Sequence, residues 1–389
     1  MPVTARERES NMKRKMRFAA VGLATALLLA ACGGAEEAAD EPAPAPAPAE
    51  SGDSGAAEEP VELSLDTLAF TFEAERTTQL MNLMAAKERT WDNIFDEVVW
   101  SVTEDPIPLL VSDERWLVNG EALALWPAME QGIVDAVIVG VFNDVDSWFM
   151  LTAPGIEKPE DLIGKTISGG KVGDSWWAVA EIIFNEEFGI PFSDVEQITM
   201  GGGSDARMEA LLAGQLDAFM GQPRHVPPVL EAGGSCLWCE YKNLAQGLFI
   251  VKRETMENHR DAVCAALGGL FEANQWFQSD GPVGQSDWRN VQPEVEEYLV
   301  ANGYDPSEGG LDVNRTWETS QGTEFNWAMD LGASVEAFDD VQRIAQREGG
   351  EVSSDFDWRD YTDMSCVWDL QEAAGLPLNP DPAEMGVTR

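Results

Sequence analysis

Thiol groups and imidazoles are the side chains of this sequence that could carry redox, metal or nucleophilic chemistry. Beyond the N-terminal region the cysteines are Cys236, Cys239, Cys264 and Cys366. The C-x-x-C spacing of the first two can be a redox motif, but it lacks a thioredoxin-like setting. A zinc site would need two further ligands, and the chain has only two histidines. An even number of cysteines outside the cytosol is typical of disulfides, so we predict two, with three possible connectivities, and no metal or other cofactor.

Catalytic motifs are scarce. His225 follows Pro223-Arg224 in a predicted loop and could act as a base, although a lone histidine is more often solvated or hydrogen-bonded. No G-x-S-x-G elbow is present. Gly164-Lys165-Thr166 resembles the end of a phosphate-binding P-loop, but Pro159 stands where that motif needs a glycine. The glycines at 169–173 lack the dinucleotide-binding spacing. The pattern therefore favours a protein that is not an enzyme.

The N-terminus has the features of a signal peptide, predicted here for residues 1–31. Six basic residues precede an apolar run at 18–31, which is shorter than the roughly 20 residues that span a bilayer. The run ends in Leu29-Ala30-Ala31-Cys32, which resembles the lipobox of bacterial lipoproteins and implies a lipid anchor on Cys32. An ordinary signal peptide with an incidental cysteine is the alternative. Residues 32–60 are rich in Ala, Pro and Glu, which predicts a disordered tether.

The charge of the chain excludes two classes of partner. The sequence has 69 acidic and 25 basic residues, for a formal net charge of −44. Nucleic acids and anionic lipid headgroups both require clustered Lys and Arg, so neither is expected to bind by charge. Dense surface carboxylates keep a protein soluble in salty water, where their mutual repulsion is screened. A surface made for a cationic partner is the alternative.

Short apolar runs alternate with helical patterns from residue 61 onward. We predict strands at 61–70, 135–141, 165–168, 197–200, 216–220 and 248–251, and helices at 74–89, 176–188, 204–212 and 254–277. Strands that alternate with helices imply parallel sheets in an α/β architecture.

One pattern occurs twice, about 80 residues apart. Residues 128–137 (AMEQGIVDAV) and 211–219 (LLAGQLDAF) each read as a helix end, a glycine, and Asp-Ala leading into a strand. Gly132 and Gly214 suit helix ends that need a positive φ. The repetition suggests two lobes of the same kind, although chance could also produce it.

The run from Ile156 to Ile167 (IEKPEDLIGKTI) resembles the entry to the second lobe of type 2 periplasmic binding proteins. Residues 195–220 continue this resemblance with a strand, a Gly-Gly-Gly-Ser loop, a helix and a G-x-x-D-A strand. The sequence is most similar to the nitrate/sulfonate/taurine-type binding lipoproteins of ABC transporters, a group that includes binders of thiamine pyrimidines. The resemblance covers about residues 61–260, and only weakly the C-terminus at 357–376. The many tryptophans at 91–148 and the segment 281–323 depart from the group, which leaves the ligand class open.

The resemblance implies an α/β fold of two lobes, each a mixed, mostly parallel sheet flanked by helices, joined by a hinge. We assign 61–152 to the first part of lobe 1, 153–243 to lobe 2, and 244–389 to the return to lobe 1 with C-terminal helices. Ligands of open α/β sheets bind at the carboxyl ends of strands, against helix N-termini. The residues predicted to line such a cleft are Phe70, Thr71, Phe72, Gly140, Phe142, Asn143, Asp174, Ser175, Trp176, Trp177, Gly202, Gly203, Ser204, Gln222 and Arg224.

Several of these residues have an alternative role. Phe70 and Phe72 could pack the core, and one of the adjacent Trp176 and Trp177 should do so. Asp174 could be only a helix cap. A bidentate Arg224 would grip an anion, whereas Asp174 in the cleft would favour an amine or heterocycle. Together these side chains favour a nitrogen-bearing or zwitterionic organic solute.

The sequence therefore predicts a monomeric, extracytoplasmic, lipid-anchored receptor that captures a small organic solute and delivers it to the permease of an ABC importer. An enzyme on the same fold, acting on a pyrimidine-like precursor, is the first alternative. A ligand sensor for a membrane receptor is the second.

Overall fold

The computed structural model describes residues 63–72, 77–103, 105–170, 175–201, 203–279, 292–305, 328–347 and 350–388. All of these lie in the unit Pro60–Arg389. The predicted signal peptide, Cys32 with its predicted lipid, and the tether lie outside the described residues, as do positions 281–291 and 306–323 of the segment 281–323. Within the described part of the chain, every helix is too short or too polar to cross a bilayer.

An eight-stranded sheet runs through the unit in the order β2-β1-β3-β8-β4-β7-β5-β6. The strands are β1 (Thr67–Phe72), β2 (Glu97–Val102), β3 (Leu117–Glu121), β4 (Ala136–Thr152), β5 (Thr166–Gly170), β6 (Glu196–Thr199), β7 (Ala218–Gly221) and β8 (Ser235–Lys252). β1, β2 and β3 are mutually parallel and form the first strand group. β5, β6 and β7 are likewise parallel and form the second strand group.

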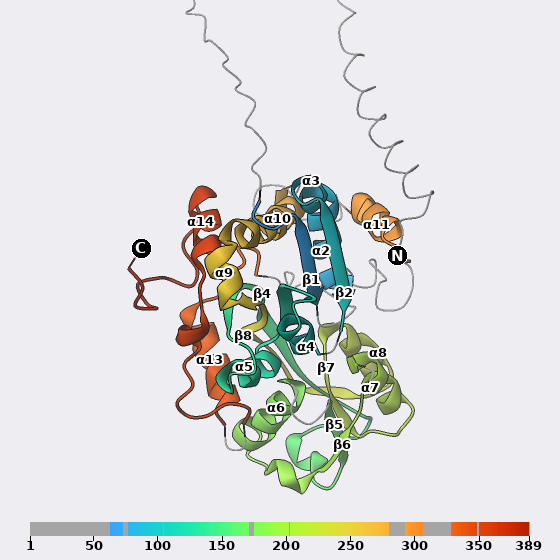
Figure 1. Ribbon diagram of the computed structural model, residues 1–389. Coiled ribbons are helices and arrows are strands. Elements are labelled where there is room, and N and C mark those ends of the chain that lie inside the picture. The colour runs from blue at the N-terminus through green and yellow to red at the C-terminus, as the bar shows by residue number, and fades with distance from the viewer. Residues whose placement is uncertain are drawn as a thin grey trace, which may run out of the picture. The chain divides into compact units, whose positions relative to one another are not determined.

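β4 and β8 connect the two groups as one long antiparallel pair (Figure 1). The end of β8 pairs with β3 in the first group, whereas the end of β4 pairs with β7 in the second. The β4–β8 register shifts at Ile138/Gly140, Val141/Asn143, Asn143/Val145 and Met150/Leu151. Such bulges bend and twist a sheet, so the middle of this pair is the place where the sheet changes direction.

Helices cover the first strand group and carry its core. They are α2 (Thr77–Ala86), η1 (Lys87–Trp91), α3 (Asp92–Ile94), α4 (Ile107–Val111), α5 (Ala122–Glu130), α9 (Arg253–Asn258), α10 (Arg260–Ser279) and α11 (Gln292–Ala301). The indole of Trp91 is fully buried against Phe70, and its Nε1 donates to the carbonyl of Ala266 on α10 at 2.9 Å. This bond satisfies the polar atom of a large core side chain and connects η1 to α10.

The second strand group is covered on both faces. Its elements are η2 (Pro159–Leu162), α6 (Ser175–Ile182), η3 (Ile183–Glu187), η4 (Phe192–Asp194), α7 (Gly203–Leu212), η5 (Pro223–His225) and α8 (Val226–Glu231). Phe149, Leu151 and Phe219 pack with Met208 and Leu211 of α7 in a separate hydrophobic cluster. The α6 side is continuous with the main core, in accord with an α/β layer structure.

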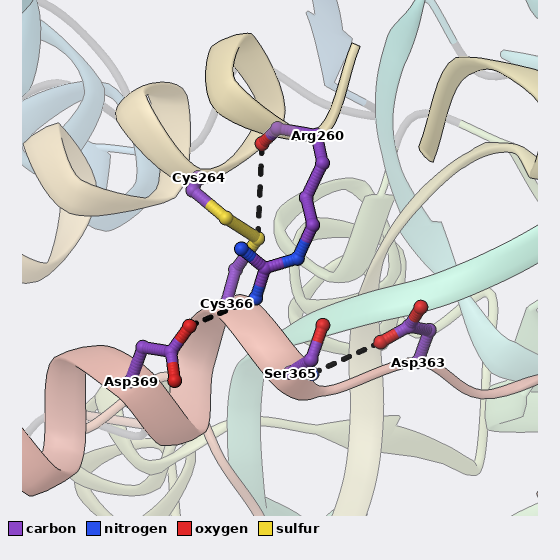
Figure 2. Close-up of a disulfide and its surroundings, with 6 residues drawn as sticks. All are labelled: Arg260, Cys264, Asp363, Ser365, Cys366 and Asp369. Atoms are coloured by element: carbon purple, nitrogen blue, oxygen red, sulfur yellow. Dashed lines mark hydrogen bonds and ion pairs between the residues drawn. A yellow bond between two sulfur atoms is a disulfide. The ribbon is translucent and has the colours of Figure 1, made fainter. Parts of the chain in front are cut away.

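The C-terminal segment returns to the first strand group with α13 (Val335–Ala345), η8 (Trp358–Tyr361) and α14 (Ser365–Ala373). Cys366 at the start of α14 forms a disulfide with Cys264 on α10, as Figure 2 shows. Arg260 and Asp369 form an ion pair of 2.8 Å beside this disulfide. The second disulfide joins Cys236 and Cys239 within β8. Two disulfides were predicted, and this is the connectivity that the sequence left open.

The α/β class with strands gathered in two groups agrees with the sequence, and so do the two glycine caps. Gly132 and Gly214 adopt φ of 67° and 70° directly after α5 and α7. The predicted strands 135–141 and 248–251 are parts of β4 and β8, which are far longer than predicted. One sheet therefore runs through both groups. The predicted lobe boundary near residue 152 lies at the end of β4, and the one near residue 243 lies in the middle of β8.

Candidate functional site

The aromatic residues predicted at the end of β1 serve the core in this conformation. Phe72 is fully buried against Trp100 at a ring distance of 6.0 Å, and Phe70 is 2 % exposed. Thr71, between them, donates from Oγ1 to the carbonyl of Ser101 at 3.0 Å. Packing was the alternative that the sequence left open for both phenylalanines.

The three residues predicted in β4 lie where this strand leaves the first group. Gly140 faces Leu267 and Phe249 of the core, and Phe142 meets the same Phe249 edge-on at 5.7 Å. Asn143 is half-buried opposite Gly247 of β8. A Cβ at position 247 would lie 2.6 Å from Oδ1 of Asn143, so glycine there makes room for the amide. Asn143 is thus the polar side chain of this trio at the bend of the sheet.

Ser175 opens α6 and connects the two strand groups. Its Oγ donates to Oε2 of Glu121, the last residue of β3 and the N-cap position of α5. Carboxylates are stabilised at helix N-termini because the backbone N–H groups there are unpaired and the helix dipole is positive. The sequence did not single out Glu121, although it ends a short strand directly before a helix, the same position as the selected residues.

The two tryptophans that follow Ser175 pack against other residues of the protein. Trp176 is 8 % exposed, and Trp177 is half-buried and edge-on to Phe192 at 5.6 Å. Of these two, Trp177 is the more exposed to solvent. Asp174 and Gly202, both predicted site residues, lie outside the described residues.

At the far side of the second group, Asp205 gathers the predicted residues Ser204 and Arg224. Arg224 donates to Oδ1 and Oδ2 of Asp205 at 3.2 and 3.1 Å, and to Oγ of Ser204 at 3.2 Å. His225 also contacts Asp205, through Nε2 at 2.9 Å. The predicted anion grip of Arg224 is therefore directed at a carboxylate of the protein itself. Gly203 opens α7 in the same loop.

This carboxylate and imidazole have shifted pKa values. The hydrogen bond from His225 is the main cause of a pKa of Asp205 well below its usual range, and Arg224 adds to it. Burial lowers the pKa of His225, which is 0 % exposed, although Asp205 acts in the opposite direction. Asp205 is thus ionised and His225 neutral at physiological pH.

Two glutamine side-chain oxygens, one just after β7 and one inside β8, are buried without a hydrogen-bond partner among the described residues. They are Oε1 of Gln222, which follows β7, and Oε1 of Gln246, which precedes Gly247 in β8. A buried acceptor without a donor costs free energy, so each is suited to accept from a bound molecule. Gln222 was predicted as a site residue; Gln246 was not, because its polar amide interrupts an apolar strand pattern.

Asp144 lies in the bent part of β4, close to the turn at 328–332. The pKa of Asp144 is raised to about 6, mainly by burial and further by the charge of Asp330. The carbonyl of Phe142 accepts from the N–H of Ala328 at 2.8 Å, which fixes the turn against β4. Within the described ranges no group of three or more His, Cys, Asp or Glu side chains is arranged to hold a metal ion.

The comparisons with known proteins agree with the resemblance read from the sequence. Residues 128–280 match the family model described as NMT1/THI5 like, which covers less than half of the chain. No curated protein matches the sequence.

Several solved structures share the fold at low sequence identity. A protein from Methylobacillus flagellatus KT, described as the periplasmic sulfonate-binding protein SsuA of an ABC transporter, is 11 % identical with a TM-score of 0.57, over 81 % of this chain and 96 % of that one. A Candida albicans gene product with the generic periplasmic binding protein fold is 13 % identical with a TM-score of 0.53, over 79 % and 95 %. The desulfurization enzyme DSZB is 11 % identical with a TM-score of 0.51, over 79 % and 99 %.

At these identities the likeness shows the fold alone, and the family match covers the segment from the end of α5 to the end of α10. The chain therefore has the periplasmic-binding-protein fold, and its residues 128–280 are an NMT1/THI5-like segment.

Proposed function

We propose that the protein is an extracytoplasmic receptor that captures a small organic solute between its two strand groups and delivers it to an ABC importer. The observation that carries this proposal is the bond from Ser175 to Glu121. It brings the N-terminus of α6 in the second group to the N-terminus of α5 in the first. Two rims of strand ends and helix starts that face each other in this way are where open α/β sheets bind ligands.

The connecting strands supply the hinge of this mechanism. Within the sheet, the chain passes from one strand group to the other through β4 and β8. The pairing of these two strands is irregular between Ile138 and Val145. Bulged pairs bend more easily than regular ones, so the second group can rotate toward the first when a solute bridges them. On this basis we propose that residues 61–152 and 244–389 form one lobe and that residues 153–243 form the other.

Three oxygen acceptors favour a solute that carries N–H donors. They are the carboxylate of Glu121 and the buried amide oxygens of Gln222 and Gln246. Arg224, already bound by Asp205, contributes less positive charge to the site than an unpaired guanidinium would. We propose a nitrogen-bearing heterocyclic or zwitterionic solute, in contrast to the sulfonate named for the M. flagellatus protein.

The location and assembly of the protein are proposed from the sequence. A signal peptide, a lipid on Cys32 and an acidic tether would hold a monomer at the outer face of the cell membrane. The excess of 69 acidic over 25 basic residues would keep such a protein soluble near the membrane in salty surroundings.

An enzyme is the second function to consider, because DSZB shares the fold. His225 is unsuited to act as a base, since Nδ1 accepts from the N–H of Gln222 and Nε2 contacts Asp205. The four cysteines beyond the N-terminal region are paired in disulfides. These engagements leave the receptor as the better supported function.

Native mass spectrometry of the full-length protein purified without denaturant tests the proposal. We expect a co-purified small molecule, and isothermal titration with that molecule should give one site per chain. After incubation with the protein, the recovered solute should have the same mass as before. Turnover of the solute, or the lack of any ligand in a panel of heterocycles, amino acids, amines and sulfonates, would overturn the receptor proposal.

A further inference from the structure

The C-terminal segment at 328–388, which includes α13, packs against the first strand group. Trp126 of α5 packs on Phe356 at a ring distance of 5.1 Å, and Glu130 of α5 accepts from the N–H of Ser353 at 3.1 Å. Within the segment, Phe338 of α13 is stacked on the fully buried Trp358 at 4.2 Å. In Figure 1, α13 lies beside α5 and the course of β8. A movement of the first group therefore carries α13 with it.

Arg347 of this segment forms an ion pair with the second strand group. Arg347, which follows α13, places Nε 3.1 Å from Oε2 of Glu181 on α6. The same guanidinium is held by Glu351 through two bonds of 2.6 and 3.0 Å. The side chain of Arg347 is only 15 % exposed. A guanidinium oriented by a fixed carboxylate is preorganised to receive a second one.

A weaker pair lies further along the same boundary. Arg343 of α13 is 3.6 Å from Glu186 of η3, with both side chains more than half exposed. Exposed pairs of this kind contribute little, so Arg347 and Glu181 are the stronger connection.

The groove beside these pairs is lined mainly by polar and charged side chains. A groove of about 580 Å³ lies between α13 and the α6–η3 helix. Its lining residues are Ile182, Glu186, Asp339, Gln342, Arg343, Gln346 and Arg347. Ile182 is the single apolar residue of that lining, so widening this groove exposes little apolar surface there and breaks the ion pairs that cross it.

We propose that Arg347 and Glu181 form a latch that sets the balance between the open and closed arrangements of the two strand groups. This inference rests on the proposed receptor function and adds its regulation. The latch stabilises the closed arrangement in the absence of solute, and salt weakens it because Glu181 is partly exposed to screening ions. Solute affinity then falls as ionic strength rises, since less of the protein is in the binding-competent state.

Glu181→Lys tests the latch, because it replaces attraction to Arg347 by repulsion and leaves the bonds to Glu351 in place. Spin labels at Ile133→Cys and Ile163→Cys, exposed positions on the two groups, report the distance between them by double electron–electron resonance in the full chain. Without solute, we expect the wild-type distance to lengthen between 0.05 and 1 M salt. The Glu181→Lys protein should already show the longer distance at low salt, and Glu181→Gln an intermediate population.

Glu187→Gln is the matched control, since Glu187 is an exposed glutamate of the adjoining η3 and no ion pair of the described residues involves it. It should behave as the wild type. For a recovered solute, Glu181→Lys should weaken binding roughly five- to tenfold at low salt, within the usual range of coupling between sites. Equal distances and equal salt responses in wild type and Glu181→Lys would overturn the latch. That distance measurement needs no solute, so it stays informative if the receptor proposal fails.

Discussion

His225 donates from Nε2 to Oδ1 of Asp205 at 2.9 Å, because its other ring nitrogen, Nδ1, accepts from the backbone N–H of Gln222, also at 2.9 Å. A backbone N–H can only donate, so the tautomer of the fully buried imidazole is determined. Asp205 also accepts a hydrogen bond from Arg224. The first turn of α7 and the η5 turn after β7 are thereby joined through one carboxylate.

We expect His225 to remain neutral through the pH range in which histidines normally titrate. Burial lowers its pKa. Nitrogen-15 NMR of the imidazole should show an unchanged pattern of one protonated and one unprotonated nitrogen from pH 8 to pH 5.5. The His259→Gln protein, with a single histidine left, gives the assignment. Conversion to the doubly protonated pattern near pH 6.5 would contradict this structure of the loop.

Asp205→Ala should lower the free energy of unfolding by about 1–3 kcal/mol, because it leaves the buried donor of His225 without an acceptor. Asp205 has a lowered pKa, so its contribution is present above about pH 4 and is lost as the pH falls through the folded pKa. Urea unfolding at pH 7 measures the loss. Glu209→Ala, at an exposed position of the same helix, is the control and should change stability by less than about 0.5 kcal/mol. Equal effects of the two substitutions would refute the role of Asp205.

Asp144→Asn should stabilise the protein at neutral pH. The pKa of Asp144 is raised from 3.8 to about 6, so folding favours its protonated form. This group contributes most stability below about pH 4, and the contribution is lost as the pH rises through 6. Removing the charge should add about 2–3 kcal/mol at pH 8 and little at pH 4. Chemical unfolding at both pH values checks this, and a gain of the same size at pH 4 would contradict it.

The parts of the fold that follow local rules could be predicted from the sequence. Gly132 and Gly214 end helices with positive φ, and strands alternate with helices through most of the second group. The length of β4 could not be predicted, because the mostly polar run 143–147 (NDVDS) interrupts its apolar pattern at the bend. A strand that crosses between two groups has no single buried face there, so period-2 alternation is lost.

The candidate site was only partly predictable for a different reason. Loops at strand ends were identifiable, but the pairing partner of each side chain lies far away in sequence. Ser175 meets Glu121 from 54 positions away, and Arg224 meets Asp205 from 19. No local pattern carries such information, and the aromatic Phe70 and Phe72 show that a strand end can equally serve the core.

The two disulfides should differ in their effect on stability. Cys264 and Cys366 are 102 positions apart, whereas Cys236 and Cys239 are three apart. In the chain-entropy description a crosslink stabilises more when it closes a longer loop. Replacing Cys264 and Cys366 by serine should cost about 4–5 kcal/mol, and replacing the other pair about 2 kcal/mol. Guanidinium unfolding of the two double variants measures the difference; an equal loss in both would show that loop closure does not dominate.

Ser175→Ala should weaken binding of the co-purified solute by about tenfold, equivalent to about 1.4 kcal/mol, and Glu121→Gln by at least as much. Ser175→Ala removes the bond that joins the helix starts, whereas Glu121→Gln keeps an acceptor but removes the charge beside α6. If the solute is cationic or rich in N–H donors, Glu121→Gln should weaken it more than Ser175→Ala does. Glu97→Gln, at the exposed start of β2, should bind as the wild type. Isothermal titration compares the four proteins. Unchanged affinity in both site variants, with circular dichroism showing intact folds, would place the solute elsewhere and remove the main support for the receptor cleft.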